Sequence, residues 1–183
     1  MAIPEGWDAD TAVAACPVLD WAGHVWRMHH QKYPATDPGG SLRTSGRYHR
    51  GLDQFREDEV FPALYLSTSP EISMGEILRH VTAEVLPTLN NRRLSKLFAR
   101  LGVVLDCRDP ALLGLAVEDL MHDTEVEATR SIGAAAFSRG VEGILAVSAT
   151  ALGDNLIVFP VHLDADSELT VVSGRDPRLQ PRS

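Results

Sequence analysis

Short runs of β-forming residues alternate along this chain with stretches of helical character, and this alternation limits the fold more than any other feature. Strands are expected at 24–28, 63–67, 103–106, 144–147, 156–159 with Val161, and 169–172, and helices within 8–19, from 69 to about 85, and at 92–100, 110–121 and 125–139. Strands this short can bury their apolar side chains by pairing into one sheet that helices cover. The sequence therefore predicts an α/β (α+β) domain with a central mixed sheet flanked by helices.

The clearest local signal is a helix start directly after the second predicted strand. Ser69 fits the N-cap, Pro70 fits the first helical position, and Glu71 follows in the first turn. Glu76 falls on the face opposite the apolar stripe of this helix, where a carboxylate is by default a solvated charge. Pro87 ends or kinks the helix. The apolar stripe consists of Met74, Ile77, Leu78, Val81 and Val85.

The length and charge of the chain exclude several classes of protein. With 183 residues we expect a single domain over 1–183, a core at about 25–173 and a flexible tail at 174–183. The net charge of -8 is opposite to that of proteins that grip nucleic acid through phosphates, so no direct nucleic-acid contact is expected. No apolar run approaches the roughly 20 residues that cross a bilayer. The acidic N-terminal segment lacks an apolar stretch, so no secretory signal is expected. A cytoplasmic protein with no membrane contact is expected.

Metal and disulfide chemistry is not indicated. Cys16 and Cys107 lie far apart and form no C-x-x-C motif, so we expect reduced, buried thiols. The seven histidines are mostly scattered, and the adjacent pair His29 and His30 point apart in either a strand or a helix. We therefore expect no metal. The phosphate-loop, dinucleotide, zinc-protease and nucleophile-elbow motifs are also absent from the sequence.

Polar residues with binding chemistry gather in the first half of the chain. The segment 32–51 is rich in Gly and Pro, and a loop of this length inside a domain is usually functional. A guanidinium group binds two oxygens of a phosphate or carboxylate at once, and glycine lets the backbone approach an anion closely. The segment therefore favours an anion site. The residues in question are Arg27, Arg43, Gly46, Arg47, Tyr48, His49, Tyr65 and Glu76.

Taken in order, these segments resemble the RES domain, which is named for Arg, Glu and Ser and is found in toxins of RES–Xre toxin–antitoxin pairs. The resemblance implies an ADP-ribosyltransferase-like fold that takes NAD+ as its substrate and breaks the nicotinamide–ribose bond. The resembling segments span 25–159 and are VWRMH around Arg27, GGSLRTSGRYHRG around Arg47, ALYLSTSPEISMGEILRH through Tyr65 and Glu76, and GVEGILAVSATALGDNLIVF through Ser148.

The resemblance also implies which residues bind NAD+. Arg27 and Arg47 would hold the pyrophosphate, and Arg43 is a second candidate for the same clamp. Tyr65 would stack on the nicotinamide ribose or position it, and Tyr48 belongs to the same binding segment. Ser148 would form a hydrogen bond within the pocket.

The catalytic set that the resemblance implies is Glu76, Arg27 and Ser148, with Ser138 as the alternative pocket serine. Cleavage of an N-glycosidic bond develops oxocarbenium character on the ribose, which a buried carboxylate such as Glu76 stabilises electrostatically. The same carboxylate can hold the 2'-hydroxyl or activate the incoming water or phosphate. This chemistry requires no metal.

Several alternatives remain open at this stage. The resemblance covers both depletion of NAD by hydrolysis or phosphorolysis, which we favour, and ADP-ribosylation of a protein. A ribonuclease toxin using His29 and His49, or a non-catalytic nucleotide-binding module, are the rival classes, and the acidic balance argues against the ribonuclease. The resemblance further implies an antitoxin partner with an Xre-type helix-turn-helix domain. By the same analogy a homodimer forms within a larger complex.

Overall fold

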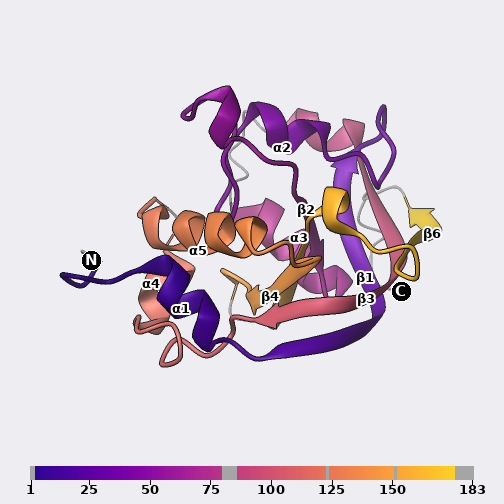
Figure 1. The fold of residues 1–183 in the computed structure, drawn as a ribbon. Coiled ribbons are helices and arrows are strands. Elements are labelled where there is room, and N and C mark those ends of the chain that lie inside the picture. The colour runs from indigo at the N-terminus through magenta and orange to yellow at the C-terminus, as the bar shows by residue number, and fades with distance from the viewer. Residues whose placement is uncertain (1–2, 80–85, 123, 151, 176–183) are drawn as a thin grey trace.

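A six-stranded sheet lies at the centre of the structure, a computed structural model that describes residues 3–79, 86–122, 124–150 and 152–175 (Figure 1). The strands are β1 (Val18–His30), β2 (Leu64–Ser67), β3 (Arg92–Asp106), β4 (Gly143–Val147), β5 (Asp154–Val158) and β6 (Glu168–Arg175). The α-helices are α1 (Ala9–Ala15), α2 (Gly39–Arg43), α3 (Pro70–Arg79), α4 (Val117–Met121) and α5 (Glu127–Ser138). Three short 3-10 helices are η1 (Glu57–Glu59), η2 (Leu86–Asn91) and η3 (Pro160–His162).

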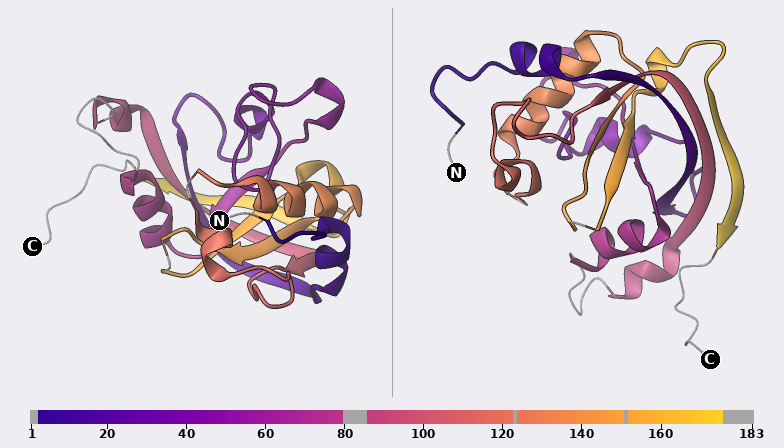
Figure 2. Two further views of the ribbon diagram at one scale, coloured as in Figure 1. Left: turned by 90° about the vertical axis from the view of Figure 1, so that its left-hand side faces the viewer. Right: turned by 90° about the horizontal axis from the view of Figure 1, so that it is seen from below.

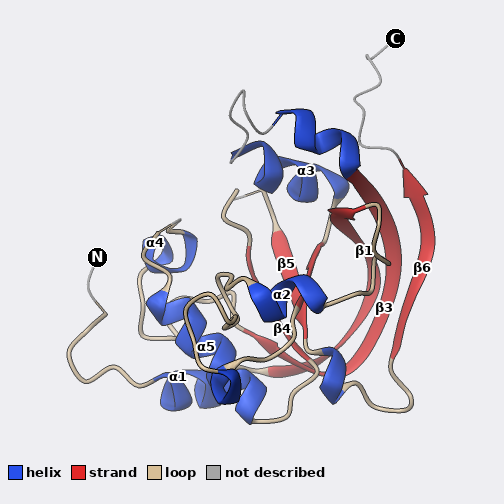
Figure 3. Ribbon diagram, turned by 90° about the horizontal axis from the view of Figure 1, so that it is seen from above, coloured by secondary structure: helices blue, strands red, loops and turns tan. Residues whose placement is uncertain are grey.

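The sheet is mixed and strongly curved. Its strand order is β1-β2-β5-β4-β3-β6, and β1 also pairs with β3, so that five of the strands follow one another around a closed circuit. The β3–β4 pair is parallel and the other pairs are antiparallel. Figure 2 and Figure 3 show the long strands β1, β3 and β6 curving around the shorter β4 and β5. The expected class, a mixed sheet flanked by helices in an α+β domain, is confirmed.

Two apolar clusters fill the two faces of the short strands. Alternation along β5 sends Leu156 and Val158 to one cluster and Ile157 to the other, as strand geometry requires. The first cluster lies inside the curve of the sheet and includes Val25, Leu64, Leu97, Val104 and Leu156. The second lies under α1 and α5 and includes Val13, Ile132, Ile144, Ile157 and Phe159. Figure 3 shows α1, α4 and α5 together on one side of the sheet and α3 at another edge.

Most of the predicted elements are present. The α3 start is confirmed: the helix begins at Pro70, and Ser69 Oγ accepts a hydrogen bond from the Ile72 amide at 3.3 Å. Gly140 follows α5 with a φ of 72°, a left-handed conformation that glycine adopts without strain. Both cysteines are free and buried, as expected.

The predicted helix at 92–100 is wrong, because these residues belong to the 15-residue strand β3. Ser95, Leu97 and Ala99 are buried while the residues between them are more exposed, which is the period of a strand. Along this segment β3 pairs with β1 on one side and with β6 on the other. Backbone pairing with two neighbours outweighs the helical propensity of its Leu, Lys and Arg residues.

Other boundaries also differ from the prediction. The strand expected at 24–28 is the 13-residue β1, and the helix expected at 110–121 is reduced to α4. Val161 lies in η3 rather than in a strand. Strand β6 continues through Arg175, two residues into the expected tail, and 176–183 lie outside the described residues.

The apolar stripe of α3 is only partly as predicted. Ile72 and Ser73 are buried, whereas Leu78 is half exposed. The stripe positions Val81 and Val85 lie outside the described residues. Within the described part of the chain, none of the helices is long and apolar enough to cross a membrane.

Candidate functional site

The carboxylate of Glu76 lies among polar groups from two strands rather than in open solvent. Ser148, directly after β4, donates from Oγ to Glu76 Oε1 at 2.8 Å. Asn155, in β5, donates from Nδ2 to the same oxygen at 2.5 Å. Ser148 is fully buried and Asn155 is nearly so. Both bonds fall on one carboxylate oxygen, Oε1, and neither involves Oε2.

Ser148 is itself oriented by the turn that follows β4. An ionised carboxylate only accepts hydrogen bonds, so Ser148 Oγ donates to Glu76 and accepts from the Thr150 hydroxyl at 2.9 Å and the Thr150 amide at 3.2 Å. Its own amide donates to Gly153 O at 2.8 Å. Ser138, by contrast, is exposed at the end of α5. The structure brings Ser148 to Glu76 and leaves Ser138 elsewhere.

Tyr65 connects strand β2 to the segment 32–51, called the glycine-rich loop below, through its hydroxyl group. The Tyr48 amide donates to Tyr65 Oη at 2.7 Å, and His49 Nδ1 lies 2.9 Å from the same oxygen. His49 Nε2 lies 2.8 Å from Thr44 O, and since a carbonyl only accepts, Nε2 carries the proton. Nδ1 therefore accepts the hydroxyl proton of Tyr65. This relay fixes the tautomer of the histidine and the path of the loop.

The loop passes so close to the Tyr65 relay that glycine is required at position 46. A Cβ atom on Gly46 would lie 2.5 Å from His49 Cε1 and 2.9 Å from Tyr65 Oη. The Gly46 carbonyl accepts a hydrogen bond from Arg130 Nε of α5 at 2.9 Å, and Arg130 Nη1 also donates to Gln54 Oε1 at 2.6 Å. Arg130 is a site-supporting residue that the sequence analysis missed, because an arginine within a helix carries no distinguishing pattern.

The two arginines proposed for the phosphate clamp have different surroundings. Arg47 is half-buried, and its Nη1 donates to Leu120 O at 2.8 Å. Arg43 is exposed at the end of α2. Burial raises the pKa of Tyr65, and in addition Arg47 acts to lower this pKa and Glu76 to raise it. Both charges therefore act on the same Tyr65 hydroxyl.

Arg27 organises the start of the glycine-rich loop. Its Nη1 donates to Ala35 O at 2.5 Å and to Asp37 O at 2.9 Å. Burial lowers the pKa of Arg27 to about 10, and the Asp37 charge opposes that shift. None of the contacts among the described residues joins Arg27 directly to Glu76. The two are linked indirectly, because the amide of the next residue, Met28, donates at 3.1 Å to Ser73 Oγ of α3.

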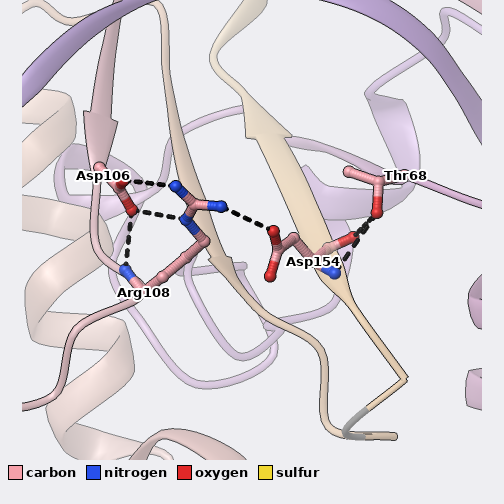
Figure 4. A network of polar contacts seen from close by, with 4 residues as sticks. All are labelled: Thr68, Asp106, Arg108 and Asp154. Atoms are coloured by element: carbon pink, nitrogen blue, oxygen red, sulfur yellow. Dashed lines mark hydrogen bonds and ion pairs between the residues drawn. The ribbon is translucent and has the colours of Figure 1, made fainter.

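A second polar network fixes the strand ends beside the Glu76 site (Figure 4). Arg108 binds both carboxylate oxygens of Asp106 at 2.8 and 2.6 Å, and its Nη1 reaches Asp154 Oδ2 at 3.0 Å. Thr68 donates to the Asp154 carbonyl from its amide and its hydroxyl, at 3.0 and 2.9 Å. The hydrogen bonds to Arg108 lower the pKa of Asp106. The ends of β2, β3 and β5 are thereby held together one residue from Asn155.

The two histidines of the ribonuclease alternative both have structural hydrogen-bond partners. His29 lies 3.0 Å from Tyr33 O through Nδ1 and 2.8 Å from Ser95 Oγ through Nε2. His49 is engaged through both ring nitrogens, as described above. Burial lowers the pKa of each imidazole. These contacts favour a structural role for both rings over acid–base catalysis.

We expect acidification to destabilise the fold through these two histidines. Because their pKa values in the folded protein lie below the ordinary value of 6.5, the unfolded chain takes up protons first as the pH falls through this value. The stability is therefore full above pH 6.5 and is lost as the pH falls below it. Urea unfolding at pH 7.5 and 5.5 measures the loss. His49→Gln is expected to reduce it, with the exposed His24→Gln as control; an unchanged pH dependence in His49→Gln contradicts this account.

Comparisons with known proteins give the family of this chain and a structure with a similar fold. The RES domain profile matches residues 24–180, and the chain therefore belongs to the RES domain family. The fold is similar to that of a chain in the crystal structure of the M. tuberculosis MbcT-MbcA toxin-antitoxin complex, with a TM-score of 0.78 and 24% sequence identity. That match covers 96% of this chain and 93% of the other. The comparison with curated proteins returned no match.

Proposed function

We propose that this protein is the toxin of a toxin–antitoxin pair and that it cleaves the nicotinamide–ribose bond of NAD+. The observation that carries the proposal is the Glu76 carboxylate, held through one oxygen by Ser148 and Asn155. Membership of the RES domain family and the fold shared with a chain of a toxin–antitoxin complex support it.

Cleavage of this bond requires a negatively charged carboxylate rather than a proton donor. When the bond between the ribose C1' and the nicotinamide nitrogen breaks, its electron pair neutralises the pyridinium ring, so nicotinamide leaves without taking up a proton. Positive charge develops on the ribose, and the ionised Glu76 stabilises it. Water or phosphate then bonds to C1', and Glu76 Oε2 can accept the proton of the nucleophile or hold the 2'-hydroxyl.

Basic side chains provide the complementary site for the pyrophosphate. Arg47 lies on the loop that Tyr65 and Arg130 fix in place, so its position is set by the same contacts that shape the site. Arg27 fixes the other end of this loop through Ala35 O. We propose that Arg47 is the principal phosphate ligand, with Arg27 shaping the loop and adding positive charge.

The choice between the two candidate clamp residues is testable by matched substitutions. Arg47→Lys keeps the charge but loses the planar fork, so the KM for NAD+ is expected to rise by about tenfold or more. Arg43→Lys, the exposed control, is expected to leave KM unchanged. Steady-state NAD+ consumption measures both, with circular dichroism as a check on folding. A raised KM in Arg43→Lys alone would assign the clamp to Arg43 instead.

The direct test of the proposed function is the loss of NAD+ on incubation with the purified protein, with and without phosphate. Loss that requires phosphate indicates phosphorolysis, and loss without phosphate indicates hydrolysis. NAD+ labelled in its ADP-ribose part separates these outcomes from transfer to a protein, since the label then becomes protein-bound. Calorimetry that shows NAD+ bound but intact after prolonged incubation contradicts the proposal and indicates a binding module.

The proposal includes a partner that holds the toxin inactive. We propose an antitoxin with an Xre-type helix-turn-helix domain that covers the entrance to the site, in a complex that contains a toxin homodimer. Two exposed leucines, Leu78 on α3 and Leu152 after Ser148, offer apolar surface for it. Any contact with DNA belongs to the antitoxin, and the protein acts in the cytoplasm.

A further inference from the structure

Asn155 has an environment that structural packing alone does not explain. Its side chain is 7% exposed, and its Nδ2 donates to Glu76 Oε1. Its Oδ1, however, is buried without a hydrogen-bond partner among the described residues. A buried acceptor without a partner destabilises a fold, so a position that served packing alone would favour an apolar side chain of this size. The side-chain hydrogen bond that Asn155 does form is the one from Nδ2 to Glu76.

The charge of Glu76 fixes the orientation of the amide. If the Asn155 amide were reversed, its oxygen would face the carboxylate oxygen, and two acceptors would oppose each other without a proton between them. The observed orientation places the amide hydrogens on Oε1 and the unpartnered oxygen away from it. The amide donor therefore binds the ionised carboxylate of Glu76, the form that faces a developing cation, more strongly than it would bind a neutral acceptor.

The backbone that carries Asn155 is held from three sides. Asn155 pairs with Ser67 of β2 and with Ala146 of β4. The preceding residue, Asp154, is bound by Arg108 through its side chain and by Thr68 through its backbone (Figure 4). A donor on so constrained a backbone holds its acceptor at a fixed position, as the support of a reacting group requires.

We infer that Asn155 is a positioning residue: with Ser148 it fixes Glu76 through Oε1 and thereby directs Oε2 toward the bound ribose. This inference rests on the proposed function and adds to it a residue outside the Arg–Glu–Ser set. Two donors on one oxygen prevent the carboxylate from rotating about its terminal bond, so the other oxygen has one direction. Removal of the amide donor leaves Ser148 as the remaining contact and restores that rotation.

Asn155→Asp tests the inference through the pH dependence of activity. The new carboxyl group has the shape of the amide, and while protonated it still donates to Glu76 Oε1. Once ionised, it repels Glu76 and the contact is lost. Between pH 5.5 and 8.5, we expect the ratio of variant to wild-type NAD+ consumption to fall by about tenfold or more as the pH rises. Asn90→Asp, an exposed matched control, is expected to follow the wild type throughout.

Two outcomes decide the matter. If Asn155→Asp follows the wild-type pH profile, or differs from it by a constant factor, Asn155 does not position Glu76. The test does not depend on turnover, because the Glu76 carboxyl carbon is also observable by NMR in protein labelled with 13C-glutamate, with Glu76→Gln for assignment. At pH 8.5 we expect the Glu76 signal of Asn155→Asp to have a different chemical shift from the wild type and that of Asn90→Asp to match it; an unchanged Glu76 signal in Asn155→Asp overturns the inference. A wild type that leaves NAD+ intact counts against the proposed function alone.

Discussion

Glu76→Gln is expected to lower NAD+ consumption by at least about 100-fold while the protein remains folded. Glutamine keeps an oxygen that accepts from Ser148 and Asn155, so both hydrogen bonds can survive the substitution. What disappears is the negative charge opposite the developing cation and the oxygen that receives a proton. The expected effect on the free energy of unfolding is therefore small, within about 1 kcal/mol. Paired measurements of NAD+ turnover and urea unfolding check both statements.

The same helix provides the control. Glu71 lies one turn and a half before Glu76 in α3 and is exposed, so Glu71→Gln removes the same charge from the same helix without touching the site. Wild-type turnover is expected for it, with a slight loss of helix stability from the weaker dipole interaction. Similar turnover in the Glu76 and Glu71 variants would mean that the charge of Glu76 plays no part in the reaction.

Gly133→Ala in helix α5 is expected to destabilise the fold. A Cβ atom at this position would lie 1.9 Å from Tyr48 O and 2.5 Å from Tyr48 C, closer than non-bonded atoms can approach. The clash is with backbone, which cannot rotate away. Alanine favours the helix by about 1 kcal/mol relative to glycine, but overpacking costs roughly 1–3 kcal/mol and occasionally more. Because Tyr48 follows Arg47, we also expect weaker NAD+ binding.

Urea unfolding measures this loss, and Gly40→Ala is the matched control. Gly40 lies in helix α2, and a Cβ atom there would have no neighbour within 4 Å. The control is expected to be neutral or slightly stabilising, in keeping with helix propensity. If Gly133→Ala were as stable as the control, the close packing of α5 against the glycine-rich loop would be wrong.

The sequence predicted those features that depend on neighbouring residues. The α3 start at Ser69 and Pro70, the strand before it and the glycine at the end of α5 all follow from local conformational preferences, and the structure confirms each. The sequence also placed Tyr65 on this strand and Glu76 on the helix that follows it. The class of fold followed from the alternation of short strands with helices.

The tertiary structure decided what depends on distant residues. Local preference favoured a helix at 92–100, yet pairing with β1 and β6 makes it a strand, because hydrogen bonds to two neighbours outweigh local propensity. Helix periodicity predicts that Glu76 is a solvated charge. In the structure it accepts hydrogen bonds from Ser148 and Asn155, which lie 72 and 79 positions away in the sequence. A carboxylate's surroundings come from strands that meet only in the folded sheet, so periodicity along one helix cannot reveal them.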